Sequence, residues 1–141
     1  MKRDAKSEAE RWLSQARRDL DDAEYLLGGS RFNQTCFLAQ QAAEKALKAF
    51  LYFRGAERVW GHSVSELCTD AIGLDRDFTA MSQPASALDK YYILTRYPNG
   101  LPGGIPADAY LREDAESALN HVRAVMAAVE AKLHRPADTD G

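Results

Sequence analysis

The sequence contains few cysteines, and they do not form a metal-binding pattern. Cys36 and Cys68 are the only two in 141 residues, and neither belongs to the clustered Cys/His spacing of a zinc site or to a dense disulfide framework. Both lie in stretches with helical periodicity, so we expect two buried, reduced thiols. The sequence predicts no metal site and no cofactor.

Long apolar runs are also absent. The first residues, MKRDAKSEAERW, are polar, and no stretch approaches the ~20 apolar residues that a membrane-spanning helix needs. We therefore expect a soluble, cytoplasmic protein with no membrane segment.

The chain has no excess of positive charge. Lys and Arg number 18 against 21 Asp and Glu, which gives a net charge of −3. The molecule as a whole therefore lacks the positive field of a general duplex-binding or membrane-surface protein. Any contact with nucleic acid must depend on a local patch.

Helical periodicity runs through most of the sequence, without a strand pattern or an internal repeat. The spacing of apolar residues predicts helices over 5–27, 32–53, 63 to about 72, 84 to about 96, and 107 to about 133. The predicted fold class is all-α, an antiparallel up-and-down bundle of four longer helices and one short helix. We expect one domain over residues 1–135 and a disordered C-terminal tail over residues 136–141.

One side of the predicted second helix carries an unusual mixture of polar and aromatic residues. They fall on a narrow line when successive residues are placed 100° apart: Asn33, Phe37, Gln41, Glu44, Lys48 and Tyr52. Aromatic rings on a polar stripe indicate that something covers it, either another subunit or a ligand with a flat ring. The alternative is an ordinary solvent-exposed face, since single exposed aromatics are common.

The segment around His62 begins the predicted third helix. Ser63 and Glu66 have the spacing of a capping box, and the N-terminus of a helix favours a bound anion or phosphate near His62. The alternative is that the His62 ring packs on Leu67 as a hydrophobic staple. The sequence contains no Walker loop, HExxH motif or nucleophile elbow.

The predicted fourth helix ends in a second segment of interest. Tyr91, Tyr92 and Thr95 are expected to face the core, while Arg96 and Tyr97 lead into YPNGLPGGIP, which holds three prolines and three glycines. The residue before Pro98 is pushed out of the α region, so the helix is expected to stop near Arg96.

These segments together resemble the HEPN family, the higher-eukaryote and prokaryote nucleotide-binding domains. The resemblance covers nearly the whole chain and rests on four stretches: WLSQARRDLDDAEYLL at 12–27, FLAQQAAEKALKAFLYFRG at 37–55, GHSVSEL at 61–67 and DKYYILTRYPNGLP at 89–102. It implies a helical bundle that forms a homodimer, often made beside a small nucleotidyltransferase of the minimal type in a toxin–antitoxin arrangement. It also implies that some relatives are ribonucleases whose motif is an Arg and a His separated by four to six residues.

That motif is missing here. After Arg96, the positions where the histidine would fall hold Leu101, Pro102 and Gly103. We therefore assign no catalytic residue, and the favoured hypothesis is a module that binds a nucleotide or an RNA end in a dimer cleft. The predicted binding residues are Gln41, Lys45, Lys48, His62, Arg96 and Tyr97, and the predicted interface residues are Phe37, Glu44 and Tyr52.

Two alternatives stay open. One is a divergent, metal-independent ribonuclease in which Arg96 binds the scissile phosphate and His62 acts as the base. The other is a protein-interaction subunit without a small ligand, whose polar stripe is simply an interface.

Overall fold

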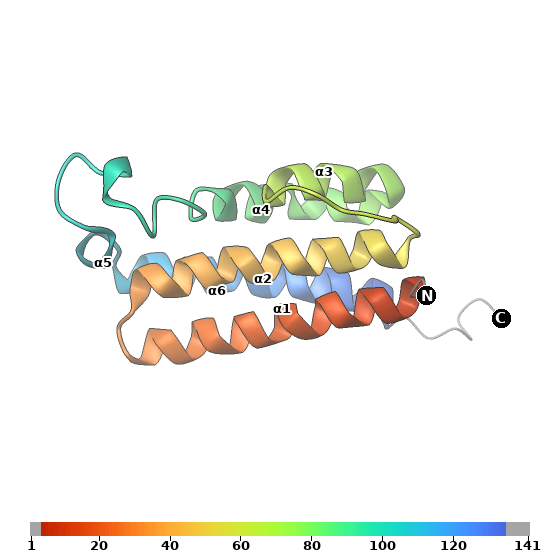
Figure 1. The fold of residues 1–141 in the computed structure, drawn as a ribbon, viewed down its shortest axis with the longest axis horizontal. Helices are drawn as coiled ribbons and strands as arrows, with labels where there is room; N and C mark the ends of the chain where they lie inside the picture. Colours follow the sequence, from red (N-terminus) through yellow and green to blue (C-terminus); the bar gives the residue numbers. More distant parts are fainter. Residues whose placement is uncertain (1–3, 135–141) are drawn as a thin grey trace.

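The computed structural model describes residues 4–134, and these form a bundle of helices with no strand among them (Figure 1). The α-helices are α1 (Ala5–Gly28), α2 (Phe32–Phe53), α3 (Val64–Leu74), α4 (Ser82–Asp89), α5 (Pro106–Ala109) and α6 (Arg112–Leu133). Two 3-10 helices, η1 (Arg76–Met81) and η2 (Pro98–Gly100), lie between them. The predicted all-helical class is confirmed. The predicted tail, 136–141, lies outside the described residues.

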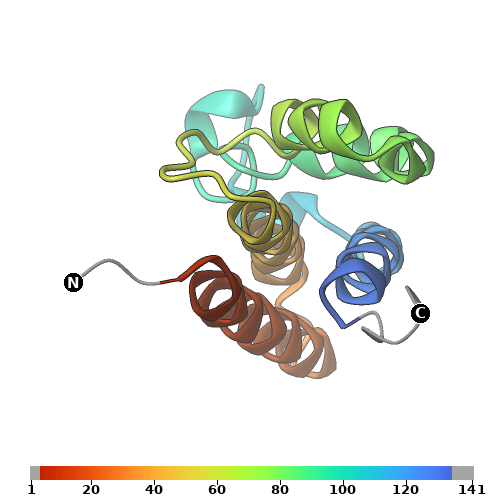
Figure 2. The ribbon, with the colours of Figure 1, turned by 90° about the vertical axis from the view of Figure 1, so that its right-hand side faces the viewer.

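Helix α2 is the centre of the bundle, with α1 and α6 on one side and the α3–α4 pair on the other (Figure 2). Helix α1 runs antiparallel to α2. Near the start of α2, Thr35 Oγ1 donates to the carbonyl of Ala23 near the end of α1, at 3.0 Å. At the opposite ends of the two helices, Trp12 of α1 stacks on Tyr52 of α2. This central position explains why most of α2 is buried, including four of the six residues on its polar line: Asn33, Glu44, Lys48 and Tyr52.

The connection from α2 to α3 differs from a simple up-and-down bundle. Gln40 donates to the main-chain oxygen of His62 at 2.8 Å, and Arg54 donates to that of Leu74 at 3.1 Å. Residues near the middle and the end of α2 thus meet the start and the end of α3, so the two helices run in the same direction. Residues 54–63 return along α2 before α3 begins (Figure 1).

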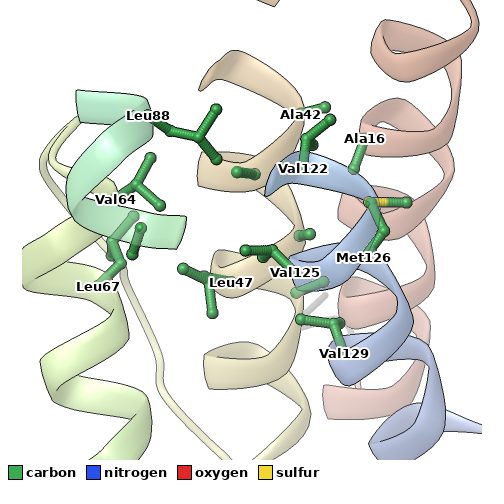
Figure 3. Close-up of a cluster of buried hydrophobic side chains, with 14 of the residues drawn as sticks. Ala16, Ala42, Leu47, Val64, Leu67, Leu88, Val122, Val125, Met126 and Val129 are labelled. Atoms are coloured by element: carbon green, nitrogen blue, oxygen red, sulfur yellow. The ribbon is translucent and has the colours of Figure 1, made fainter. Parts of the chain in front are cut away.

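The core is built around the apolar side of α2. Leu47 is fully buried and lies among Leu67 of α3, Leu88 of α4, and Val125 and Val129 of α6 (Figure 3). Small residues let the neighbouring helices approach α2 closely, and five alanines of α2 are fully buried: Ala39, Ala42, Ala43, Ala46 and Ala49.

Both cysteines are buried and free, as predicted. Burial raises the pKa of the Cys36 thiol to about 12, and it raises the pKa of Cys68 as well. Thiols in this environment are protonated and unreactive near neutral pH.

The fourth helix is shorter than predicted. It ends at Asp89, and residues 90–96 form turns instead of the expected last two helical turns. Main-chain hydrogen bonds of the turn type continue there, and side chains donate to carbonyls of this segment as well. Thr95 Oγ1 donates to the Tyr91 carbonyl, and Asn33 Nδ2 donates to the Thr95 carbonyl at 3.0 Å. Such competition from side chains draws the backbone away from the helical ladder.

The predicted last helix is divided in two. Tyr110 and Leu111 are extended, with φ of −96° and −108°, and they separate α5 from α6. Helix α6 restarts because the Asp114 carboxylate accepts from the Leu111 main-chain N–H at 2.8 Å. Within residues 4–134, no helix is long and apolar enough to cross a membrane.

Candidate functional site

The start of α3 already carries an anion supplied by the chain itself. Ser63 Oγ accepts from the Glu66 N–H at 3.1 Å, as its cap position predicts. The Asp89 carboxylate accepts from Ser63 Oγ at 2.7 Å and from the N–H groups of Val64 and Ser65 at 2.5 and 3.0 Å. The expected attraction of an anion to this helix end is therefore satisfied by Asp89.

The His62 ring lies just outside this cap and is exposed to solvent. It stacks on Tyr92, with ring centroids 5.0 Å apart and planes inclined by 15°. Its Nδ1 lies 3.2 Å from Oε2 of Glu44; the His62 side chain is 60% exposed and that of Glu44 only 5%. The ring therefore contacts Tyr92 and Glu44, two residues that the sequence did not connect with His62.

Arg96 is surrounded by aromatic rings. The guanidinium carbon lies 4.3 Å from the ring centre of Phe37, 4.9 Å from that of Tyr92 and 5.1 Å from that of Tyr97. Its Nε donates to the Tyr92 carbonyl at 2.8 Å. Cations are attracted to the faces of such rings, so the guanidinium is held in place without a carboxylate.

We call these five residues, Phe37, His62, Tyr92, Arg96 and Tyr97, the arginine–aromatic cluster. They come from the first half of α2, the end of the 54–63 segment and the turns after α4. None of the ion pairs among residues 4–134 includes Arg96.

The polar line on α2 is covered by side chains of the same chain. Lys48 Nζ donates to Glu44 Oε2 at 3.0 Å, and both side chains are buried. Lys48 also lies over the Trp12 ring, 5.4 Å from its centre. Gln41 Nε2 donates to Gln40 Oε1 at 2.8 Å.

The predicted interface residues need a correction on this point. Tyr52 stacks on Trp12 at 5.6 Å and accepts from the Val59 N–H at 3.1 Å, so it is only 9% exposed. Glu44 is equally buried, which leaves little surface of either residue for a partner. Phe37 is half-buried beneath Arg96. The sequence indicated a covered stripe, with an exposed face as the alternative. The covering comes from α1 and the 54–63 segment of the same chain, where the prediction was another subunit or a ligand.

Lys45 lies apart from the cluster. It turns toward α1, where its Nζ pairs with the buried Asp19 at 2.5 Å. It borders an open groove of about 900 Å³ lined mainly by α1, from Lys6 to Gln15. This groove contains no residue of the arginine–aromatic cluster.

The structure therefore brings together five of the six predicted binding residues: Gln41, Lys48, His62, Arg96 and Tyr97. Glu44 and Tyr92 connect them, and the sequence assigned neither of these two to ligand binding. Tyr91 is buried as expected, and burial raises its pKa to about 12; Tyr92 is half-buried and belongs to the cluster. The helical spacing that suggested a core position for Tyr92 does not apply, because α4 has already ended.

The arrangement offers a planar cation, ring faces and an imidazole at one surface. The two Nη groups of Arg96 are suited to paired hydrogen bonds with a phosphate, and exposed rings can stack on a base. Tyr97 is 49% exposed. No group of three or more metal-ligating side chains occurs within residues 4–134.

Comparisons with known proteins agree on one family. A family model described as the HEPN domain matches residues 9–132. Over 131 residues the chain is 24% identical to a Methanocaldococcus jannaschii protein named Putative toxin MJ1304, with 86% of each chain covered.

Solved structures show the same similarity. The chain is 42% identical to TT1696 from Thermus thermophilus, with a TM-score of 0.80 over 88% of this chain and 97% of that one. It is 36% identical to an archaeal HEPN homologue, with a TM-score of 0.75 over 94% and 99% of the two chains. A HEPN domain protein from Thermotoga maritima is 30% identical, with a TM-score of 0.68 over 89% and 99%.

Proposed function

This chain belongs to the HEPN domain family, and from that premise we propose that it binds a nucleotide, free or at the end of an RNA, at the arginine–aromatic cluster. The observation that carries the proposal is the position of Arg96. Its guanidinium is fixed by one main-chain oxygen and three rings, and it forms no ion pair within residues 4–134. A cation that is held in place but not neutralised is suited to a phosphate.

The neighbouring rings support a nucleotide over a simple anion. Tyr97 and His62 are both substantially exposed beside Arg96, and each presents a flat face. Stacking of a base on an aromatic ring contributes about 1–3 kcal/mol in single-strand binding. A ligand with both a phosphate and a base would use the whole cluster.

Partners follow from the family and stay part of the proposal. Relatives in this family commonly form homodimers and act beside a small nucleotidyltransferase. We propose both for this chain, with Phe37 and Tyr97 near the dimer cleft. Purification from the native cell followed by mass measurement tests both points. We expect two copies of this chain in each particle and a small nucleotidyltransferase that purifies with them.

A thermal-shift measurement tests the binding proposal. ATP at saturating concentration is expected to raise the melting temperature of the wild type by mass action. Arg96→Ala removes the shift, and Arg96→Lys reduces it because the lysine keeps the charge but not the planar fork. Arg18→Ala is the matched control, since Arg18 is an exposed arginine paired with Asp22 on α1. A melting curve that no nucleotide changes would contradict the proposal.

One observation favours a second candidate, a divergent ribonuclease. His62 and Arg96 both contact the ring of Tyr92, so a base and a phosphate-binding cation lie at one surface. The 2′-oxygen would attack phosphorus as His62 takes its proton, Arg96 would stabilise the charge, and the departing 5′-oxygen would leave with a proton from water. The name of the Methanocaldococcus relative is in keeping with a toxin.

RNA incubation separates the two candidates. A ribonuclease is expected to shorten a labelled single-stranded RNA, and His62→Ala to abolish the cleavage. His134→Ala serves as the control, because His134 lies at the end of α6 beside Arg17 and Glu10. RNA that is intact after long incubation with the wild type would exclude this candidate and leave binding alone.

A further inference from the structure

Glu44 is a buried carboxylate to which the proposed function gives no role. Its Oε2 accepts from Lys48 Nζ at 3.0 Å and lies 3.2 Å from His62 Nδ1. Its Oε1 accepts from Gln41 Nε2 at 3.4 Å. All its contacts are therefore donors, as a carboxylate paired with an ammonium requires.

This contact determines which nitrogen of neutral His62 carries the hydrogen. An ionised carboxylate can only accept, so Nδ1 must be the donor and Nε2 is left as the acceptor. The two ring nitrogens point in divergent directions. With Nδ1 directed at the buried Glu44, Nε2 lies on the exposed side of the ring.

A closed circuit of hydrogen bonds holds His62 in this orientation. Gln40 is fully buried and donates to the His62 main-chain oxygen at 2.8 Å. Gln41 donates to both Gln40 and Glu44, at 2.8 and 3.4 Å. The circuit therefore fixes the backbone and the ring of the same residue, and Tyr92 supports the face of the ring. Satisfied buried networks of this kind favour a single arrangement.

We propose that Glu44 is a positioning residue that fixes His62, on the Tyr92 ring that Arg96 also contacts, with Nε2 as a hydrogen-bond acceptor, so that the site prefers ribonucleotides to deoxyribonucleotides. The preference for ribonucleotides rests on the proposed function, nucleotide binding at this cluster. The orientation of the His62 ring does not depend on that function. A ligand that uses both groups must offer a phosphate to Arg96 and a donor to His62. The 2′-hydroxyl is a donor that only the ribose has.

The position of His62 is tested by nitrogen NMR of the imidazole rings. In the wild type the neutral His62 ring is expected to carry its hydrogen on Nδ1, with His121 and His134 as internal comparisons. Glu44→Gln shifts His62 toward the Nε2–H form. Asp19→Asn is the control and leaves the His62 ring unchanged, although it also removes a carboxylate that pairs with a lysine, Lys45. An Nε2–H form in the wild type would overturn the proposal.

The wild-type spectrum tests the position of His62 even if the Glu44→Gln variant does not fold. Glu44→Gln leaves the buried Lys48 without its counter-ion, which costs stability. The wild-type measurement needs no substitution and decides the point by itself.

The ligand preference is tested by titration with AMP and 2′-deoxy-AMP. The 2′-hydroxyl adds one neutral hydrogen bond to His62, so we expect the wild type to bind AMP roughly three- to tenfold more tightly than 2′-deoxy-AMP. Glu44→Gln is expected to lose this ratio and Asp19→Asn to keep it. Equal affinities in the wild type would overturn the ribose preference. If neither nucleotide binds while His62 carries its hydrogen on Nδ1, the proposed function fails and the positioning role of Glu44 stands.

Discussion

Tyr91 and Tyr92 are neighbours in the chain but have different environments. Tyr91 is buried in the core, and Tyr92 is half-buried and contacts both His62 and Arg96. The difference arises because the turns that follow Asp89 direct successive side chains to opposite sides. The same short stretch therefore contributes one residue to stability and the next to the candidate site.

Single buried groups also determine how stability responds to pH, and Cys36 gives a direct prediction. Its pKa is 9.0 in the unfolded chain and about 12 when folded, mainly through burial. Above pH 9 the unfolded state binds fewer protons than the native state, so the contribution of Cys36 is complete below pH 9 and is lost as pH rises toward 12. Between pH 9.5 and 11, the free energy of unfolding should fall more steeply in the wild type than in Cys36→Ala, by about 1.4 kcal/mol per pH unit.

Urea unfolding at a series of pH values measures this difference. Burial raises the pKa of Tyr91 to about 12, and Cys36 adds a smaller part of that shift. The part caused by burial lowers stability in the same direction in both proteins and therefore cancels in the comparison. Equal slopes for the wild type and Cys36→Ala would show that the Cys36 thiol ionises alike in both states.

At the scale of elements, α3 depends on a residue from α4. Asp89 ends α4 and accepts three hydrogen bonds from the first turn and cap of α3. The interaction adds three hydrogen bonds between two helices that are otherwise joined by η1, by their apolar faces and by a contact of 3.4 Å between the hydroxyls of Ser65 and Ser86. It also positions His62, which directly precedes the capped turn.

We predict that Asp89→Ala lowers the free energy of unfolding by about 1–2 kcal/mol, because it removes both a cap and a negative charge at a helix N-terminus. Urea unfolding checks the value. Asp22→Ala is the control: it removes an exposed aspartate paired with Arg18 within α1, and exposed pairs contribute about 0–1 kcal/mol. An Asp89→Ala variant as stable as this control would show that Ser63 suffices as the cap.

At the scale of the whole molecule, the net charge of −3 limits how nucleic acid can bind. Arg96 is the one Lys or Arg in the arginine–aromatic cluster, while Lys45 and Lys48 are neutralised by Asp19 and Glu44. Binding should therefore depend on one phosphate contact and on stacking, rather than on a broad positive surface.

The salt dependence of binding tests this expectation. For a short single-stranded RNA, one phosphate contact predicts a slope of about −0.7 in a plot of log K against log salt concentration. Fluorescence anisotropy of a labelled RNA measures the slope. In Arg96→Ala we expect weaker binding with a slope near zero; a slope of about −3 or steeper in the wild type would require a basic surface elsewhere.

The sequence by itself determined the fold class and predicted most of the residues that form the candidate site. Apolar spacing defines α1 and α2 almost to the residue, since such spacing must be buried on one side of a helix. The Ser63 cap and the buried cysteines follow from equally local chemistry. Arg96, Tyr97 and His62 stand out because their segments interrupt the helical pattern.

Only the tertiary structure decided what covers the polar line of α2 and which residues meet His62. Periodicity gives the direction of a side chain around its own helix but not the neighbour that reaches it. The return of residues 54–63 along α2 brings His62 to Glu44, and the early end of α4 brings Tyr92 to His62. Both contacts join residues distant in sequence, and such pairing depends on how the connecting segments pack rather than on any local pattern.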